Sequence, residues 1–344
     1  MSKKLISIVL MFLLIFIGFI GSVESEFISK DVTLNNQQES REYATGLIKK
    51  YDENGHLIPN PISLSGFAPD NWDWRKASFN GKYGDWTTRI RDQAQCGSCW
   101  AFGLVAALET VYNIQNNNPN IDIDLSEQFI VSCPSYYGYS VGDCCGGFFP
   151  NALNFVRNVG TITEACFSYK AIDANGRDAG DCKGLRIPSN DPVECNEKCE
   201  DWESYIIKVD NYHSLSNHQS IKNAIVTYGP VIAAFDIYYD FYEYDGGVYE
   251  RNSNIYSGGH VVAIVGYNDD QDYWICKNSW GTNWGENGWF KIKYGECGIG
   301  SPGSCAYITG YNKRLKNNQF LNNQNLIQWF PVFQLLLSII KIGM

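Results

Sequence analysis

The chain has 344 residues, 12 of them cysteines, and a formal net charge of -10 at pH 7. This length can bury a sizeable core, and the acidic balance excludes an extended basic surface, so we expect no nucleic-acid partner. Twelve cysteines are more than a reducing cytosol usually holds without metal, so we expect an oxidising compartment and disulfide bonds.

The N-terminus has the layout of a secretory signal. Two lysines precede an apolar run over residues 5–20, and the small-residue stretch "GSVES" offers a cleavage site. We interpret residues 1–25 as a signal peptide, with a retained membrane anchor as the alternative. Residues 26–66 are polar and broken by Gly and Pro, which predicts a short leader or propeptide before a folded unit at 67–312. The expected location is the secretory pathway, ending in a lysosome or vacuole or outside the cell.

The spacing of apolar residues changes along this folded unit. Residues 99–115 show helical spacing, and "DLSEQ" (124–128) supplies cap residues for a second helix. After residue 205, short apolar runs separated by glycines and acidic turns predict strands of a mostly antiparallel sheet. We therefore expect an α+β fold, with a helical subdomain, a β-barrel-like subdomain and a cleft between them.

The stretch "DQAQCGSCWAF" (92–102) places Cys96 and Cys99 at the start of the predicted helix. A thioredoxin-like redox pair would need an alternating βαβ pattern, which the later strands do not supply. A zinc site would need a second pair, for which "CNEKC" (195–199) is the one candidate. Disulfides are the better default in such a chain, and we expect neither a metal nor a cofactor.

A third interpretation makes one of these cysteines a nucleophile. "CGSCWAF" resembles the active-site segment of papain-family, cathepsin-like cysteine proteases. "LSEQFIVSC", "CCGGFF", "GPV", "GHVVAIVGY" and "KNSWGTNWGENGW" follow in the family's order over residues 67–312. The resemblance implies a papain-like fold and four site residues: Cys99 as nucleophile, His260 as base, Asn278 as its orienting partner and Gln93 as an oxyanion donor.

Physical arguments support two of these roles. A cysteine at a helix N-terminus beside an imidazolium has a lowered pKa and becomes a thiolate, whereas a buried half-cystine is the alternative without a histidine partner. Only four histidines exist, and the other three lie in polar segments, whereas His260 opens an apolar strand. His260 is therefore the candidate base.

The turn length predicts how the histidine meets its partner. Strands 260–267 and 273–280 flank "NDDQD", so a hairpin pairing Tyr267 with Tyr273 makes His260 and Asn278 diagonal neighbours on one face. A slip by one residue would place them on opposite faces. In this register the Asn278 amide oxygen accepts the imidazole N–H, and Trp280 shields that bond.

The same resemblance implies where a peptide substrate would bind. Glycines would let its backbone approach closely, and apolar side chains would form a pocket. The residues implied are Gly146, Gly147, Phe148, Phe149, Ala234, Gly259 and Trp280. No paired-histidine insertion like that of the dipeptide-removing cathepsin B branch is present, so we expect an endopeptidase.

Family resemblance also suggests disulfides between Cys96 and Cys144 and between Cys133 and Cys182, with Cys297 and Cys305 pairing locally. Two further bridges of unknown connectivity would join Cys145, Cys166, Cys195 and Cys199. An odd cysteine remains, and we expect Cys276 to be a buried free thiol, since it lies inside an apolar strand.

Both ends of the chain depart from the family. The leader is shorter than the helical inhibitory propeptides of the cathepsin L branch and lacks a matching motif, which leaves an inhibitory role open. Residues 313–344 form a polar spacer and then an apolar tail, as in a GPI-attachment signal, with an amphipathic or sorting tail as the alternative. We expect a monomer with this tail as a membrane attachment.

The predicted reaction is hydrolysis of peptide bonds in proteins or peptides through a Cys99 thioester. Two other function classes stay open on the same scaffold. One is an inactive fold that only binds partners, and the other is a ligase that transfers the acyl group to an amine. Product analysis with an added amine separates the last from hydrolysis.

Overall fold

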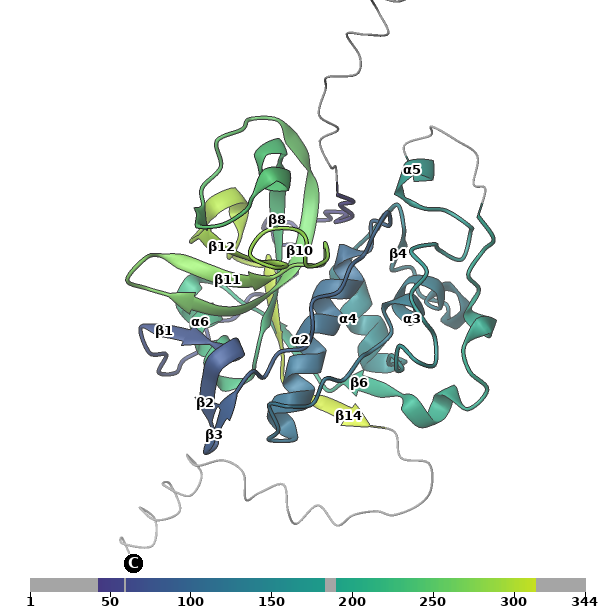
Figure 1. The fold of residues 1–344 in the computed structure, drawn as a ribbon, viewed down its shortest axis with the longest axis horizontal. Coiled ribbons are helices and arrows are strands. Elements are labelled where there is room, and N and C mark those ends of the chain that lie inside the picture. Colours follow the sequence, from purple (N-terminus) through teal and green to yellow (C-terminus); the bar gives the residue numbers. More distant parts are fainter. Residues whose placement is uncertain (1–42, 59, 183–189, 314–344) are drawn as a thin grey trace, which may run out of the picture.

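The computed structural model describes residues 43–58, 60–182 and 190–313. The predicted signal peptide, the first part of the leader and the tail from residue 314 lie outside these residues. The described chain forms two halves, one mainly helical and one built on a sheet, as Figure 1 shows. This is the predicted α+β arrangement. Within the described ranges, no helix is long and apolar enough to cross a membrane.

The first helices begin where the sequence predicts them. Helix α2 (Cys99–Gln115) covers the predicted range, and α3 (Glu127–Ser132) follows the predicted cap segment. The Ser126 hydroxyl caps α3, because it accepts a hydrogen bond from the Phe129 N–H at 3.0 Å. The other α-helices are α4 (Phe149–Asn158), α5 (Ala179–Cys182) and α6 (His218–Thr227).

The largest described sheet has eight strands in the order β7-β13-β8-β10-β11-β12-β9, with β1 paired to β10. Its neighbours are antiparallel except for β12 and β9. Its strands are β1 (Asn71–Asp73), β7 (Tyr212–Ser214), β8 (Val231–Tyr238), β9 (Val248–Tyr249), β10 (Tyr256–Asn268), β11 (Tyr273–Lys277), β12 (Trp289–Lys293) and β13 (Cys305–Ile308). Small two-stranded ladders join β2 (Ala77–Phe79) to β3 (Lys82–Gly84), β4 (Gly142–Asp143) to β5 (Gly146–Gly147), and β6 (Ile207–Val209) to β14 (Tyr311–Lys313).

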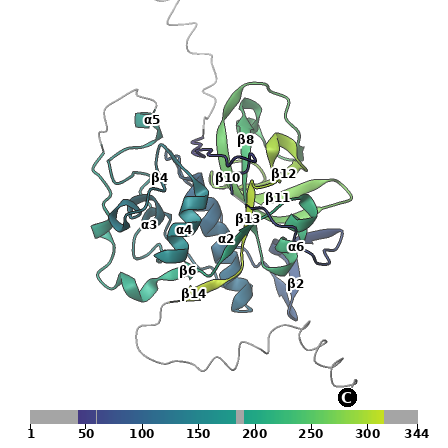
Figure 2. The same ribbon diagram turned by 180° about the vertical axis from the view of Figure 1, so that it is seen from behind.

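Helix α2 packs directly on strand β10, where the two halves meet (Figure 2). A Cβ added to Gly103, in the first half of α2, would lie 2.8 Å from the Val261 side chain. Glycine is unfavourable inside a helix, so its presence here reflects the close approach of helix and strand. The N-terminus of α2 is thereby held beside the start of β10.

The β10–β11 hairpin combines two registers. Near the turn, Tyr267 pairs with Trp274 and not with Tyr273, so the predicted pairing is wrong there by one residue. A bulge between Ile264 and Gly266 absorbs the extra residue, and beyond it Ala263 pairs with Lys277, as predicted. The bulge therefore restores the register in which His260 and Asn278 face each other.

Four disulfides occur among the described residues. Cys96 is bonded to Cys144, as the family resemblance suggests. Cys133 is bonded to Cys195, so the expected Cys133–Cys182 bond is wrong. The remaining bridges are Cys145–Cys182 and Cys166–Cys199. Three of the four bonds therefore attach the cysteine-rich insertion, residues 166–199, to itself or to the segment that precedes it.

The remaining cysteines are free thiols. Cys276 is buried in β11, which agrees with its predicted state. Cys297 and Cys305 do not pair, so the expected local bridge between them is also wrong. Cys305 is held in β13, and its side chain is fully buried in the sheet half, whereas Cys297 lies in a separate short 3₁₀ turn.

These bonds predict a specific peptide map. Digestion of the secreted protein without reduction should release a Cys133 peptide linked to a Cys195 peptide, and a Cys145 peptide linked to a Cys182 peptide. Mass spectrometry before and after reduction measures both links. A Cys133–Cys182 peptide in protein alkylated before digestion would contradict this connectivity.

Candidate active site

Cys99 is the first residue of α2, and its side chain is fully buried. Burial raises the pKa of its thiol to about 12, although the backbone N–H groups of Val261 and Gly46 face the sulfur and oppose this rise. The expectation of a thiolate therefore does not hold in this covered arrangement. The position of Cys99 at the helix N-terminus does not lower the thiol pKa enough to offset the rise caused by complete burial.

His260 lies on β10 and directly precedes Val261, whose backbone N–H faces the Cys99 sulfur. Its Nε2–H donates to the Asn278 Oδ1 at 2.8 Å, which leaves Nδ1 as the unprotonated nitrogen of the neutral ring. Nδ1 is buried and has no hydrogen-bond partner in the described chain. Burial lowers the pKa of His260 to about 4, although the Asn278 bond raises it. Cysteine and histidine are therefore both neutral here.

Trp280 covers the histidine–asparagine pair. Its ring lies 4.8 Å from the His260 ring, measured between centroids, and is itself almost fully buried. Excluding water from a hydrogen bond strengthens it, so the indole keeps the imidazole plane fixed. This is the shielding position predicted from the sequence.

Gln93 is held by both ends of its amide. Its Oε1 accepts from the Ser279 hydroxyl at 2.7 Å, so its Nε2 is the group that donates to the carbonyls of Cys96 and Ala44, at 2.8 and 3.0 Å. The backbone adds a further bond, from the Gln93 N–H to the Ser279 carbonyl at 2.8 Å. The amide N–H is thus aimed into the cleft.

The leader runs through this cleft. The Leu47 N–H donates to the Gly259 carbonyl at 3.0 Å, and the Ile48 N–H donates to the Gly147 carbonyl at 2.9 Å. In return the Gly147 N–H donates to the Gly46 carbonyl at 2.8 Å. The leader is therefore paired with backbone from both halves, and Figures 1 and 2 both show it between them.

Gly46 lies where the leader has no room for a side chain. A Cβ at this position would lie 1.7 Å from the Gly97 carbonyl oxygen, a distance that no side chain can adopt. Two residues earlier, the Ala44 carbonyl accepts from both Gln93 and the Trp280 indole N–H, the latter at 3.2 Å. A leader carbonyl thus takes the place at which an oxyanion was expected to bind.

Other predicted substrate-binding residues divide into two groups. Gly147, Gly259 and Trp280 bond to the leader backbone, and Gly146 lies beside Gly46 at φ +125°. Phe148 is partly exposed at the cleft edge, beneath the Lys50 ammonium. Phe149 begins α4 and is fully buried in the core of the helical half, so its expected place in the pocket is wrong.

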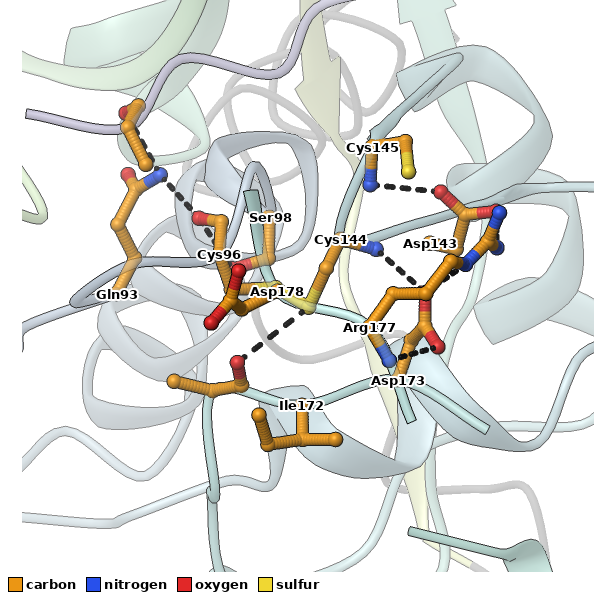
Figure 3. The surroundings of a disulfide bond; sticks show 12 residues. Gln93, Cys96, Ser98, Asp143, Cys144, Cys145, Ile172, Asp173, Arg177 and Asp178 are labelled. Carbon is orange, nitrogen blue, oxygen red and sulfur yellow. Dashed lines mark hydrogen bonds and ion pairs between the residues drawn. A yellow bond between two sulfur atoms is a disulfide. The ribbon is translucent and has the colours of Figure 1, made fainter. Parts of the chain in front are cut away.

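Figure 3 shows the Cys96–Cys144 disulfide near Gln93, whose amide donates to the Cys96 carbonyl. The neighbouring N–H of Cys144 contacts the Asp173 carboxylate at 3.4 Å, and Arg177 pairs with both Asp173 and Asp143. This ion-pair cluster fixes the insertion against β4 and β5, next to the glycines that hold the leader.

Sequence reasoning missed the polar residues that support the site. Ser279 directly follows Asn278, and a hydroxyl at that spacing could have been tested as a partner for Gln93. Behind it, the Lys277 Nζ donates to the Thr88 hydroxyl at 2.7 Å, and Thr88 in turn donates to buried Glu109 of α2. Buried charges joining α2 to β11 give no recognisable sequence pattern, because their partners are far apart in the chain.

The described residues contain no group of three or more His, Cys, Asp or Glu side chains that could hold a metal ion.

Curated proteins of similar sequence include the gut-specific cysteine proteinase of Caenorhabditis elegans, 35% identical over 62% of this chain and 66% of that protein. Cathepsin B of Dictyostelium discoideum is 33% identical over 73% of this chain and 75% of its own length. The chain thus spans just under two thirds of the first of these relatives.

Similar solved structures include digestive procathepsin L2 from Tenebrio molitor, with a TM-score of 0.56 and 28% identity over 80% of both chains. Procathepsin B S9 from Trypanosoma congolense, at 20% identity and a TM-score of 0.57, covers 80% of this chain and 87% of its own, and supports the fold alone. The family model described as papain family cysteine protease matches residues 68–307. The chain belongs to the papain family of cysteine proteases.

Proposed function

We propose that this protein is a cysteine endopeptidase whose nucleophile is Cys99. The observation that carries the proposal is the buried His260–Asn278 hydrogen bond beside the sulfur, together with the Gln93 amide aimed at a carbonyl oxygen in the cleft. These groups come from α2, β10, the segment after β11 and the segment before α2. Their convergence fits nucleophilic catalysis better than a binding surface.

The reaction begins with the transfer of the thiol proton to His260 once the cleft is open to solvent and substrate. The Cys99 sulfur attacks the peptide carbonyl, while the Gln93 Nε2–H and the Cys99 backbone N–H stabilise the oxyanion. His260 then gives its proton to the leaving amine, and a thioester remains. Water that loses a proton to His260 attacks the thioester, releases the acid and restores the thiol.

Endopeptidase specificity is part of this proposal. Removal of dipeptides from a C-terminus needs a positive group that holds the terminal carboxylate at the end of the cleft. No histidine occurs between residues 57 and 212, and Arg177, the cation fixed beside β4, is engaged by two aspartates. An internally quenched peptide with both ends blocked should be cleaved, and successive dipeptide release from an unblocked peptide should be absent.

The segment 43–58 of the leader serves as an inhibitor in this proposal. It fills the cleft through backbone hydrogen bonds and places a carbonyl on Gln93, so a substrate carbonyl cannot bind there. It also keeps Cys99 and His260 buried and neutral. Disulfides support maturation in the secretory pathway, where the leader would be removed. A ligase remains the alternative, and an added amine that enters the product would favour it.

Two substitutions test the proposed roles. Cys99→Ala should remove hydrolysis, because no other described group lies in the position of attack. Asn278→Ala should lower kcat/KM by about 10- to 100-fold, since the imidazole loses the acceptor that fixes its plane. Kinetics with a peptide substrate measure both, with exposed Asn283→Ala as a matched control in the same loop. Full turnover by Cys99→Ala or Asn278→Ala would exclude the respective role.

A third substitution tests the leader. Gly46→Ala should displace the leader, because the added Cβ meets the Gly97 carbonyl, so the uncleaved chain should hydrolyse peptide at least about tenfold faster than the unsubstituted uncleaved chain. The early reaction rate is measured while intact mass shows that the leader is still attached. Gly55→Asn is the control, since its left-handed backbone suits Asn and its surroundings are open. Equal low rates in both uncleaved variants would argue against inhibition through this contact.

A further inference from the structure

Within the described residues, one ion pair joins the leader to the domain. The Lys49 ammonium forms an ion pair with the Asp236 carboxylate of β8. Lys49 lies three residues beyond Gly46, the leader residue whose N–H faces the Cys99 sulfur. The ion pair is therefore three residues along the leader from the residue that faces the nucleophile.

Asp236 is placed next to the site by the sheet. In the β8–β10 ladder it pairs with Gly259, whose carbonyl holds the Leu47 N–H, and the adjacent pair is Phe235 with His260. Asp236 is the one charged residue in the strand "VIAAFDIY". A carboxylate at this position is not required by packing, since the strand is otherwise filled with apolar and aromatic side chains.

A cavity adjoins this ion pair. From the domain it is lined by Ala234, Asp236 and Ser304, and from the leader by Lys49, Tyr51 and Leu57. Removal of the leader therefore takes away part of the wall and the partner of the carboxylate. Ala234, which the family resemblance places in an apolar pocket, lies in this cavity next to a negative charge.

No second basic side chain pairs with Asp236 in the described part of the chain. The other ionisable groups that act on its surroundings are the tyrosines Tyr51, Tyr238 and Tyr256, and burial raises the pKa of Tyr256. Arg251 lies over the Tyr238 ring and does not reach the carboxylate. Once Lys49 leaves, a half-buried carboxylate remains unpaired and favours a replacement cation.

We propose that Asp236 selects substrates with a lysine or arginine side chain two or three residues from the scissile bond, and that Lys49 occupies this subsite in the uncleaved chain. This inference rests on the proposed peptidase function. It adds a preference for a positively charged substrate side chain to the apolar pocket that the sequence implies. An ammonium or guanidinium group of the substrate would pair with Asp236 in the position that Lys49 holds before cleavage.

The test uses the processed enzyme and paired peptides that differ only by arginine or leucine at each of these positions. The unsubstituted enzyme should show a kcat/KM for arginine about tenfold above that for leucine at one position. Asp236→Asn, which keeps the shape and removes the charge, should bring this ratio close to one. Asp236→Lys should reverse the charge preference toward glutamate.

Asp245→Asn provides a matched control, because Asp245 is an exposed carboxylate in the loop after β8. The arginine-to-leucine ratio should not change in this variant. A ratio near one in the unsubstituted enzyme at both positions, or a ratio that Asp236→Asn leaves intact, would overturn the proposal.

A binding measurement separates this inference from the proposed activity. Fluorescent forms of the same peptides are titrated into processed Cys99→Ala protein, which needs no turnover. Tighter binding of the arginine peptide that disappears in Cys99→Ala/Asp236→Asn would support the subsite even if the unsubstituted chain hydrolyses no peptide. Equal binding of both peptides would reject the subsite whatever the activity.

Discussion

The candidate site depends on the close packing of α2 against β10. Gly103 allows the helix to approach Val261 closely. The Cys99 sulfur is thereby held at the Val261 N–H, one residue after His260. The sulfur and the imidazole come from opposite halves of the molecule, so neither half alone carries the chemistry. Buried Lys277, Thr88 and Glu109 tie the same helix to β11 and hold the interface from behind. Packing and charge thus act together on one interface.

The leader lies across this interface and contacts both halves. Its backbone bonds to Gly147 on one side and Gly259 on the other, and these bonds need no particular side chain in the leader. Covering the site removes water, and the loss of water disfavours both the thiolate and the imidazolium. One covalent segment therefore blocks access and suppresses the reactive ion pair at once. Lys49 adds a side-chain contact whose chemistry a substrate could reproduce.

Local features of the fold could be predicted from the sequence. The start of α2 at Cys99 follows from apolar spacing, and the His260–Asn278 pair follows from the hairpin and the family motifs. The pairing predicted near Tyr267 was wrong by one residue. The prediction still holds at the site, because a bulge between Ile264 and Gly266 restores the predicted register before the strand reaches His260. A bulge depends on tertiary packing and leaves no clear mark in this sequence.

Long-range features could not be predicted in the same way. Cys182 and Cys195 are chemically equivalent, and only the path of the insertion decides which of them reaches Cys133. The path of the leader was equally hidden, since most of its hydrogen bonds across the site are made by backbone and its residues show no periodic pattern. Asp236 had a visible signal, a carboxylate within an apolar strand, but its meaning required the position of Lys49.

Labelling with an epoxide-type thiol inactivator, followed by peptide mass mapping, tests the central claim most directly. The reagent is applied to the intact chain and to the chain from which the leader has been removed. A Cys99 that lies under the leader and beside His260 should be labelled only after removal, with loss of peptide hydrolysis. Equal labelling of Cys99 in both forms, or labelling at Cys297 in place of Cys99, would contradict it.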